Sequence, residues 1–332
     1  MNRPRPLRRV RSIKRKIAIL IVVATATAAA VSQVGLRFGW PVWIRPVVAC
    51  AISLLLVEFL AHGLTSPLRD MERASARMAK GDYGVRVRDD TADEVGRLAV
   101  AFNAMAGELA EVDRQRRDLV ANASYELRTP ITGLQATLEH LIDGVVPCTP
   151  ATLTTMHGQV ERLGRLVHDL LDLSRLEAGV APLRLEPVAL VELVHHVVDG
   201  LGVALPTLDV EMHVPVADLK VQADGERLAQ VLTNLLTNAA RYSAHVVVTA
   251  EETDAGVRVL VTDDGPGIPA GEEGRIFERF YRADRARHNG GAGLGLAISR
   301  LIVELHGGCI RAERNDPHGC RMVVELPRSE LS

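Results

Sequence analysis

Two long apolar stretches dominate the first 64 residues of the chain. The first, Ile17–Leu36, contains twenty residues without a charge, which is about the length of a helix that crosses a ~30 Å hydrocarbon core. The second covers residues 46–64 and is interrupted by Glu58. We predict transmembrane helices over residues 17–36 and 46–64, joined by a short extracytoplasmic loop at 37–45. A cleaved signal peptide is the alternative for the first stretch, but its apolar run exceeds the usual ~7–15 residues.

After residue 64 the apolar positions repeat with the spacing of a coiled coil. Six residues recur at alternating intervals of three and four: Val95, Leu98, Phe102, Met105, Leu109 and Val112. A weaker series of Leu68, Met71 and Met78 precedes them, and a connector containing Gly81 and Asp82 separates the two series. We therefore predict two short helices of a parallel coiled coil over residues 65–117.

A second helical pair follows, over residues 118–180. Its first helix carries the series Leu127, Ile131, Leu134, Leu138 and Leu141, and its second carries Leu153, Met156, Val160, Leu163, Val167 and Leu170. Gly144 and Pro147 lie between the two series and are expected to end the first helix. One such hairpin exposes an apolar stripe that it cannot bury alone. We therefore predict a homodimer in which two hairpins form a four-helix bundle.

The formal charge of -2 conceals an uneven distribution. Residues 1–64 carry ten basic residues and one acidic residue, whereas the remaining 268 residues carry 29 basic and 40 acidic residues. The basic arm at 1–16 places the N-terminus in the cytoplasm by the positive-inside bias, and two spans would return the chain to the cytoplasm. We therefore predict a multi-pass protein of the plasma (inner) membrane with both termini in the cytoplasm. No direct nucleic-acid binding is expected. The four cysteines form no C-x-x-C pair and indicate neither a zinc site nor a disulfide framework.

The C-terminal half is predicted to be an α/β domain, because β-rich runs at 244–250 and 257–262 alternate with helical stretches. Within it, Asn234 and Asn238 share one helix face and Arg241 follows them. Amide oxygens suit a hard cation such as Mg²⁺, and a guanidinium suits phosphate. If this cluster stood alone, the polar face of an ordinary helix would be the favoured explanation.

Two further clusters are typical of a nucleotide site. Asp263 follows a predicted strand and can accept a hydrogen bond from the amine of a base, while Gly265 and Gly267 permit close backbone approach. The glycine-rich run Gly290–Ala297 opens a helix, so its backbone N–H groups suit phosphates. The run lacks the Lys-Ser/Thr pair of a Walker A loop and lies too far along the chain to begin a Rossmann unit.

In this order, the clusters resemble the N, G1, F and G2 boxes of the histidine-kinase ATPase domain, with the F box at Ile276–Arg282. The coiled-coil segment resembles a HAMP domain at Pro67, at Gly81-Asp82 and at Asp93-Glu94-Val95-Gly96, although a plain juxtamembrane coiled coil is an alternative. The chain thus resembles a two-component sensor histidine kinase. The resemblance implies a HAMP domain (65–117), a dimerisation and H-box domain (118–180) and a GHKL (Bergerat) α/β sandwich (185–330).

The resemblance also implies ATP and Mg²⁺ as ligands and a cognate response regulator as partner. The ATP-binding residues that it implies are Asn234, Asn238, Arg241, Tyr242, Asp263, Gly265, Gly267, Arg282, Gly291, Gly293, Leu294 and Gly295. Among them, Asn238 would bind Mg²⁺ with support from Asn234, and Asp263 would accept the adenine amine. Arg241 would meet phosphate, Tyr242 would pack near the adenine, and the last four residues would line the lid and the phosphates.

The chain departs from the family at the phosphoacceptor. Its H box reads Ser124-Tyr-Glu-Leu-Arg-Thr-Pro130, so Tyr125 stands where a histidine is expected. A phenol has a pKa of about 10, so about 0.1% is ionised at pH 7, and the lost nucleophile costs about 4 kcal/mol. A phosphotyrosine ester is also a poor donor to an aspartate. By the resemblance, Glu126 would be the general base, and Glu126 with Thr129 keeps the E-x-x-T pattern that positions a water for dephosphorylating the regulator.

Three functions stay open at this point. The chain could be a kinase that phosphorylates Tyr125, or a histidine of a partner chain in a heterodimer. It could instead be a phosphatase or ATP-dependent regulator of a response regulator, or a non-catalytic scaffold. The intact nucleotide motifs argue against a scaffold, which needs none of them. We therefore expect a member of the histidine protein kinase family whose self-phosphorylation is the open point.

Overall fold

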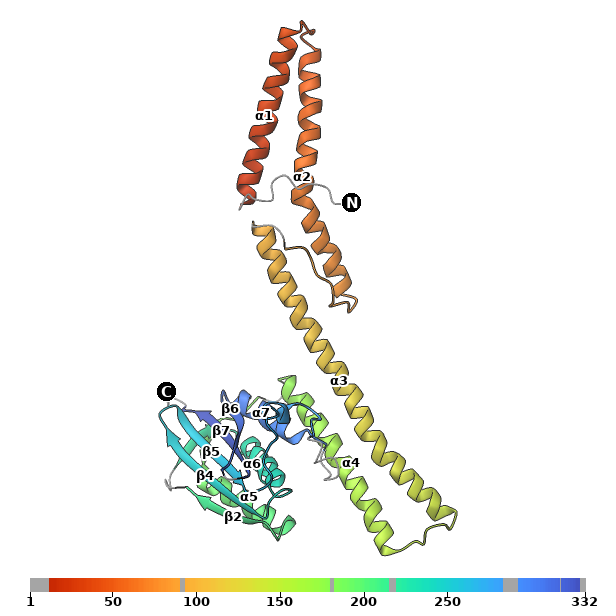
Figure 1. Cartoon of the computed structure of the whole chain (residues 1–332), viewed down its shortest axis with the longest axis vertical. Helices are drawn as coiled ribbons and strands as arrows, with labels where there is room; N and C mark the ends of the chain where they lie inside the picture. The colour runs from red at the N-terminus through yellow and green to blue at the C-terminus, as the bar shows by residue number, and fades with distance from the viewer. Residues whose placement is uncertain are drawn as a thin grey trace. The chain divides into compact units, whose positions relative to one another are not determined.

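The computed structural model describes residues 12–89, 93–179, 182–214, 219–282, 292–316 and 318–328 (Figure 1). The chain forms two compact units, Met1–Asp118 and Leu119–Ser332, and the boundary between them lies within one long helix. The described part is helical before residue 180 and mixes helices with strands after it, as the periodicity predicted.

The first unit begins with two long helices, α1 (Ile13–Arg37) and α2 (Ile44–Met78), which run side by side in opposite directions (Figure 1). The side chain of Ser53 in α2 donates a hydrogen bond to the backbone oxygen of Ala24 in α1 at 3.2 Å. By length and composition, the segment Ile17–Arg37 can cross a membrane. The same test identifies no second such segment among the described residues, which exclude the side chains of 59–64, so only one of the two predicted spans is supported.

A small apolar core joins the end of α2, the connector and the start of α3 (Glu94–Ile142). Its buried members are Met71, Ala74, Val85, Val87, Val95 and Ala99. Asn103 fixes the connector to α3, because its side-chain oxygen accepts from the N–H of Val87 and its side-chain nitrogen donates to the Val87 carbonyl, both at 2.9 Å. The connector therefore follows a defined and partly buried path.

The two helices and the connector predicted for this segment are present, but neither helix is short. Helix α2 runs without a break from the apolar stretch through Pro67 to Met78, and α3 continues for 49 residues into the next domain. The change from a continuous apolar pattern to a heptad pattern changes which side chains are apolar, but it does not interrupt the backbone hydrogen bonds of the helix. The predicted seam is only partly covered within one chain, since these members are exposed: Leu98, Met105, Leu109 and Val112.

The second unit begins within α3 and continues into α4 (Pro150–Glu177), and the two helices form the predicted hairpin. Helix α3 ends at Ile142, and Gly144 follows with a φ of +70°, a left-handed conformation that glycine adopts readily. Thr149 caps α4 by accepting a hydrogen bond from the N–H of Thr152 at 3.2 Å. The predicted break between the helices is therefore confirmed.

The rest of this unit is an α/β domain built on a five-stranded sheet in the order β2–β4–β5–β7–β6. The strands are β2 (Asp209–His213), β4 (His245–Thr253), β5 (Gly256–Asp263), β6 (Cys309–Arg314) and β7 (Cys320–Pro327). Only β2 and β4 pair in parallel among these neighbours. A second sheet pairs β1 (Glu186–Ala189) with β3 (Lys220–Ala223), and the helices are α5 (Leu190–Ala204), α6 (Gly225–Ala239) and α7 (Gly295–Leu305).

Alternate residues of the central strands are buried, so one face of the sheet packs against the helices. The resulting core includes leucines and valines of α6, Ile298 and Ile302 of α7, and inward-facing valines of β4 and β5. Leu166, Leu173 and Leu176 of α4 belong to the same core. The hairpin and the α/β domain therefore share one apolar core within this unit.

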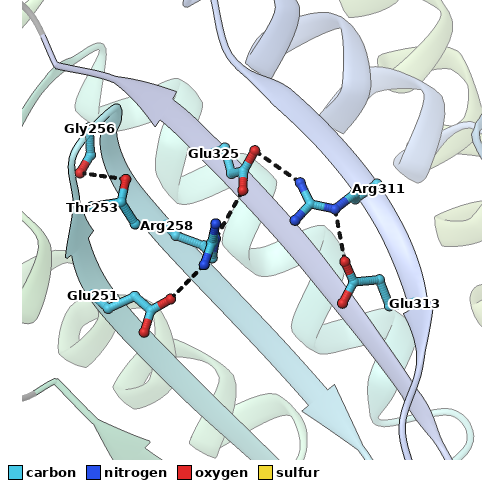
Figure 2. A network of polar contacts seen from close by, with 7 residues as sticks. All are labelled: Glu251, Thr253, Gly256, Arg258, Arg311, Glu313 and Glu325. Atoms are coloured by element: carbon cyan, nitrogen blue, oxygen red, sulfur yellow. Dashed lines mark hydrogen bonds and ion pairs between the residues drawn. The ribbon is translucent and has the colours of Figure 1, made fainter.

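The opposite face of the sheet carries a chain of ion pairs that links four strands (Figure 2). Arg258 on β5 contacts Glu251 on β4 and Glu325 on β7, each at 2.9 Å. Arg311 on β6 contacts the other oxygen of Glu325 at 2.9 Å and Glu313 at 2.8 Å. These charged side chains therefore pair with one another on the outer face of the sheet.

Candidate functional site

The predicted nucleotide residues meet at one cleft of about 910 Å³ in the second unit. Its walls come from α3 and α4 of the hairpin and from α6, β5, β7 and the loops of the α/β domain. The predicted residues that line it are Glu126, Asn234, Asn238, Arg241, Tyr242, Asp263, Gly267, Arg282, Gly293, Leu294 and Gly295. Gly265 is adjacent to this lining, and Gly291 lies outside the described residues.

Asp263 is the last residue of β5, and it is 8% exposed. Its Oδ1 accepts hydrogen bonds from the N–H groups of Gly265 at 2.9 Å and Cys320 at 3.2 Å. Burial raises the pKa of the carboxyl, and the two backbone N–H groups act in the opposite direction. Its other oxygen accepts no hydrogen bond from the described residues, so one acceptor of a fixed carboxylate is available to a ligand.

Gly265 and Gly267 are required by the close packing of the loop after β5. A Cβ at Gly265 would lie 3.0 Å from both Asp263 Oδ1 and Tyr242 Cβ. Gly267 has a φ of +72°, and its Cβ would lie 2.9 Å from the carbonyl oxygen of Gly319. Gly265 therefore lets the backbone approach Asp263 and Tyr242, and Gly267 lets it approach Gly319.

Helix α6 presents both predicted asparagines to the cleft, because its apolar face is held in the core. The side-chain nitrogen of Asn234 donates to the carbonyl of Gly295 at 3.1 Å and to Ser299 Oγ at 3.3 Å, which joins α6 to the start of α7. This leaves its carboxamide oxygen as an acceptor, and Asn238 lies one turn further on. Among the described residues no cluster of three or more His, Cys, Asp or Glu could hold a metal ion. The donor set fits Mg²⁺ only if amide oxygens are joined by oxygens of the substrate.

Arg241 and Tyr242 follow the end of α6 and line the cleft. Burial lowers the pKa of the Arg241 guanidinium, Tyr242 acts in the opposite direction, and three other guanidinium groups lower it further. Those groups belong to Arg282, Arg165 and Arg162. Arg241 is exposed to solvent at the cleft, and an arginine surrounded by positive charge is suited to an anionic ligand.

The F-box segment and the glycine-rich segment are joined through their backbones. Phe280 has a φ of +61°, which is unusual for a residue with a side chain, and its N–H donates to the carbonyl of Gly293 at 2.9 Å. Gly293 has a φ of +72°, and a Cβ there would lie 2.8 Å from the backbone of Phe280 and Tyr281. Leu294, which is fully buried, anchors the start of α7.

Only part of the H box faces the cleft. Glu126 lines the cleft and is partly buried, whereas Tyr125 and Thr129 do not line it. Tyr125 is 68% exposed on the surface of α3, and the Thr129 hydroxyl donates to the Tyr125 carbonyl at 3.4 Å. The structure therefore places the predicted general base beside the nucleotide residues and leaves the acceptor position on the open helix surface.

Sequence reasoning missed the contribution of α4. Arg162, Arg165 and Asp169 line the cleft, and their spacing of three and four is the signal that could have placed them on one helix face. Asp172, one turn beyond, is buried and accepts hydrogen bonds from Arg227 at 2.7 and 2.9 Å and from Gln230 at 2.7 Å. Because these partners are on α6, this cluster fixes the hairpin to the α/β domain.

Comparison with known families finds three matching domain models in the same order. Residues 59–111 match the HAMP domain, and residues 115–179 match the His Kinase A (phospho-acceptor) domain. Residues 223–330 match the histidine kinase-, DNA gyrase B- and HSP90-like ATPase. The chain is also similar to the signal transduction histidine-protein kinase BaeS of Escherichia coli, with 35% identity over 86% of this chain and 62% of that protein. The kinase/phosphatase MprB of Mycobacterium bovis is 34% identical over 85% of this chain and 58% of its own length.

Solved structures agree with these matches. The Acinetobacter baumannii histidine kinase AdeS superposes with a TM-score of 0.54 and 29% identity, covering 62% of this chain and 98% of that one. Histidine kinase ThkA in complex with the response regulator protein TrrA gives a TM-score of 0.54 and 27% identity, covering 67% and 66%. The chain spans about three fifths of the length of the curated relatives it matches. It belongs to the sensor histidine kinases of two-component systems, a family of ATP-dependent phosphotransferases.

Proposed function

We propose that this chain is a membrane-bound sensor kinase that binds ATP with Mg²⁺ and controls the phosphorylation of a response regulator. The observation that carries the proposal is the convergence of Asp263, Asn238 and Arg241 with Glu126 of the hairpin at one cleft. A nucleotide needs an acceptor for its base, a cation site and positive charge for its phosphates. Asp263 supplies the first from the end of β5, and Asn238 and Arg241 supply the other two from the end of α6 and the residues after it.

In this proposal each motif has a separate task. The available oxygen of Asp263 accepts the adenine amine, beside Tyr242, in the space that Gly265 and Gly267 leave open. Asn238, supported by Asn234, completes the coordination of Mg²⁺, which neutralises phosphate charge when bound. Arg241 and Arg282 meet the phosphates. Gly293, Leu294 and Gly295 line the lid and the phosphates; Gly291, which is expected with them, lies outside the described residues.

Tyr125 changes the chemistry that follows nucleotide binding. A histidine imidazole is a nucleophile near pH 7 and gives a labile phosphoramidate, whereas a phenol gives a stable ester. We therefore propose that the ordinary relay from histidine to aspartate does not pass through residue 125 of this polypeptide. Either a histidine on another chain would accept the phosphoryl group, or this chain would only remove phosphoryl groups from the response regulator.

The test is incubation of the full chain with radiolabelled ATP, comparing wild type with Tyr125→His and with Tyr125→His combined with Asp263→Ala. We expect an acid-labile label on Tyr125→His alone, because that variant restores the acceptor and the double variant loses the adenine contact. An acid-labile label on the wild type would contradict the account of Tyr125. Absence of nucleotide binding by the wild type would contradict the assignment of the cleft.

A response-regulator phosphatase is the second candidate function. Glu126 and Thr129 are retained at i and i+3 on α3, and Thr129 is exposed, so a partner protein could reach it. The relative MprB carries both activities in its name, kinase/phosphatase. The test is the loss of label from a phosphorylated regulator, with Thr129→Ala as the variant expected to slow that loss. An unchanged rate in Thr129→Ala would contradict this function.

We also propose that the chain acts as a multi-pass protein with both termini in the cytoplasm and as a homodimer. The antiparallel contact of α1 with α2 supports a second span over residues 46–64. The apolar residues left exposed along the hairpin support a second copy as the occupant of that face, and they include Ile131, Leu138, Leu153, Val160 and Val167. A heterodimer with another kinase would cover the same face. Co-purification of two differently tagged copies distinguishes the two assemblies.

A further inference from the structure

Five arginines from two different parts of the second unit line the same cleft, and one of them is Arg314 at the end of β6. Arg241 and Arg282 belong to the nucleotide motifs of the α/β domain, and Arg162 and Arg165 belong to α4 of the hairpin. The first two were implied by the family resemblance, whereas nothing in the motifs points to the second two. Their presence at the nucleotide cleft needs its own explanation.

The position of the α4 arginines is fixed by packing. Residues 162 and 165 are three apart and share a helix face, and the next residue, Leu166, is 5% exposed within the core. Two turns further, Asp172 is held by Arg227 and Gln230 of α6. These contacts beside and beyond the two arginines oppose rotation of α4 about its axis, so the helix face that carries Arg162 and Arg165 stays directed to the cleft.

The charges near these arginines leave room for an anion. Neither Arg162 nor Arg165 forms a salt bridge or a side-chain hydrogen bond with any residue that the structure describes. Four acidic residues also line the cleft, Glu126, Asp169, Asp263 and Glu272, and Arg165 acts on Asp169. The charged side chains that act on Arg241, apart from Tyr242, are nevertheless all arginines. Like charges on facing walls repel each other, and a polyanion placed between them turns this repulsion into attraction.

We propose that Arg162 and Arg165 form the hairpin's half of a phosphate-binding site, so that the triphosphate of the nucleotide bridges α4 and the α/β domain. This inference rests on the proposed binding of ATP at Asp263. The phosphates are the part of that substrate that carries several negative charges, and guanidinium groups bind them with charge-assisted hydrogen bonds. Arg162 and Arg165 are positioning residues, which connect occupancy of the nucleotide site to the hairpin that carries the H box.

The proposal predicts a selective loss of phosphate recognition. We would measure the affinity of the full chain in lipid nanodiscs for the non-hydrolysable analogue AMPPNP with Mg²⁺ and for adenosine. In Arg162→Ala combined with Arg165→Ala, AMPPNP affinity should fall about tenfold. Adenosine affinity should stay within about twofold of wild type, because adenosine has no phosphates.

Two controls separate charge from structure. Arg162→Lys combined with Arg165→Lys keeps the positive charge and should recover most of the AMPPNP affinity. Arg175→Ala removes a charge from the same helix at an exposed position that does not line the cleft, and it should leave both affinities unchanged.

The outcomes distinguish this inference from the function on which it rests. Suppose that the wild type binds both ligands. If the double alanine variant then loses AMPPNP and adenosine affinity equally, or loses neither, the role of Arg162 and Arg165 is overturned and the proposed nucleotide site is not. Failure of the wild type to bind adenosine and AMPPNP would overturn the proposed nucleotide site and this inference with it. Loss of AMPPNP affinity in Arg175→Ala equal to that of the double variant would show a general effect of charge and would also overturn it.

Discussion

The buried ion pair between Asp172 and Arg227 can be tested by a double-mutant cycle. Asp172 is 7% exposed and accepts two contacts from one nitrogen of Arg227, at 2.7 and 2.9 Å, and one from Gln230 at 2.7 Å. The side chain of Arg227 is 23% exposed. Since Asp172 is on α4 and Arg227 is on α6, the pair joins the hairpin to the ATPase domain.

The burial of this pair sets the expected magnitude. Exposed ion pairs contribute about 0.2–1 kcal/mol, whereas hydrogen bonds to charged groups in protected surroundings contribute about 1.5–3 kcal/mol. Removal of one partner leaves the other charge buried, which costs about 3–5 kcal/mol. We therefore expect Arg227→Ala and Asp172→Ala each to cost about 3 kcal/mol, with a coupling energy of about 2 kcal/mol between them.

The assay is thermal unfolding of the full chain followed by circular dichroism, for wild type, both single variants and the double variant. A loss of about 3 kcal/mol lowers the unfolding temperature of a unit of this size by roughly 6–12 °C. A parallel cycle at Glu251 and Arg258, on the exposed face of the sheet, should give a clearly smaller coupling. A coupling below about 0.5 kcal/mol between Asp172 and Arg227 would refute the reasoning, because it would place the pair among solvated surface contacts.

Three further predictions concern the ATPase domain. Gly293→Ala should abolish nucleotide binding, because its Cβ would lie 2.8 Å from backbone atoms, whereas Gly271→Ala, with a φ of +85° and no atom within 4 Å, should bind normally. Burial raises the pKa of the Asp224 carboxyl, but backbone N–H groups and nearby cations outweigh it and lower the pKa below 3.8. In urea unfolding, the free energy of unfolding of the wild type should therefore exceed that of Asp224→Asn above pH 3.8, and the difference should vanish as the pH falls through the folded pKa. Burial raises the pKa of the Cys320 thiol to about 12, so iodoacetamide at pH 8 should modify the exposed Cys309 and spare Cys320.

The sequence predicted most of the elements, because each has a simple periodic signal. The strand over residues 257–262 and the helix that carries Asn234 and Asn238 were expected from alternation and from spacing, and the structure confirms both. Helix ends marked by special backbone geometry were also predictable, as at Gly144. The end of the second apolar stretch was a poor marker of a helix end, because α2 continues through Pro67.

The part of the site on α4 was not predictable, because that helix carries two apolar stripes. One stripe includes Val160 and Val167, which are exposed, and the other includes Leu166 and Leu173, which are buried in the shared core. Both repeat every seven residues, so periodicity alone does not decide which stripe faces the ATPase domain. The assignment of Arg162 to the cleft depends on that choice, which only the packed structure provides.

Tyr125 is the position at which nucleotide chemistry and acceptor chemistry can be separated. The nucleotide residues lie in the cleft with Glu126, whereas Tyr125 is 68% exposed beside it. An exposed helix position tolerates substitution within about 0.5 kcal/mol, so Tyr125→His should unfold at nearly the wild-type temperature and bind nucleotide with the same affinity. Any difference in labelling between the two proteins then reports the acceptor itself. Tyr125→His could bind ATP, unfold at the normal temperature and still take no label. That result would show that the missing imidazole is not what separates this chain from a self-phosphorylating kinase. The position of Glu126 at the cleft would then be the next feature to test.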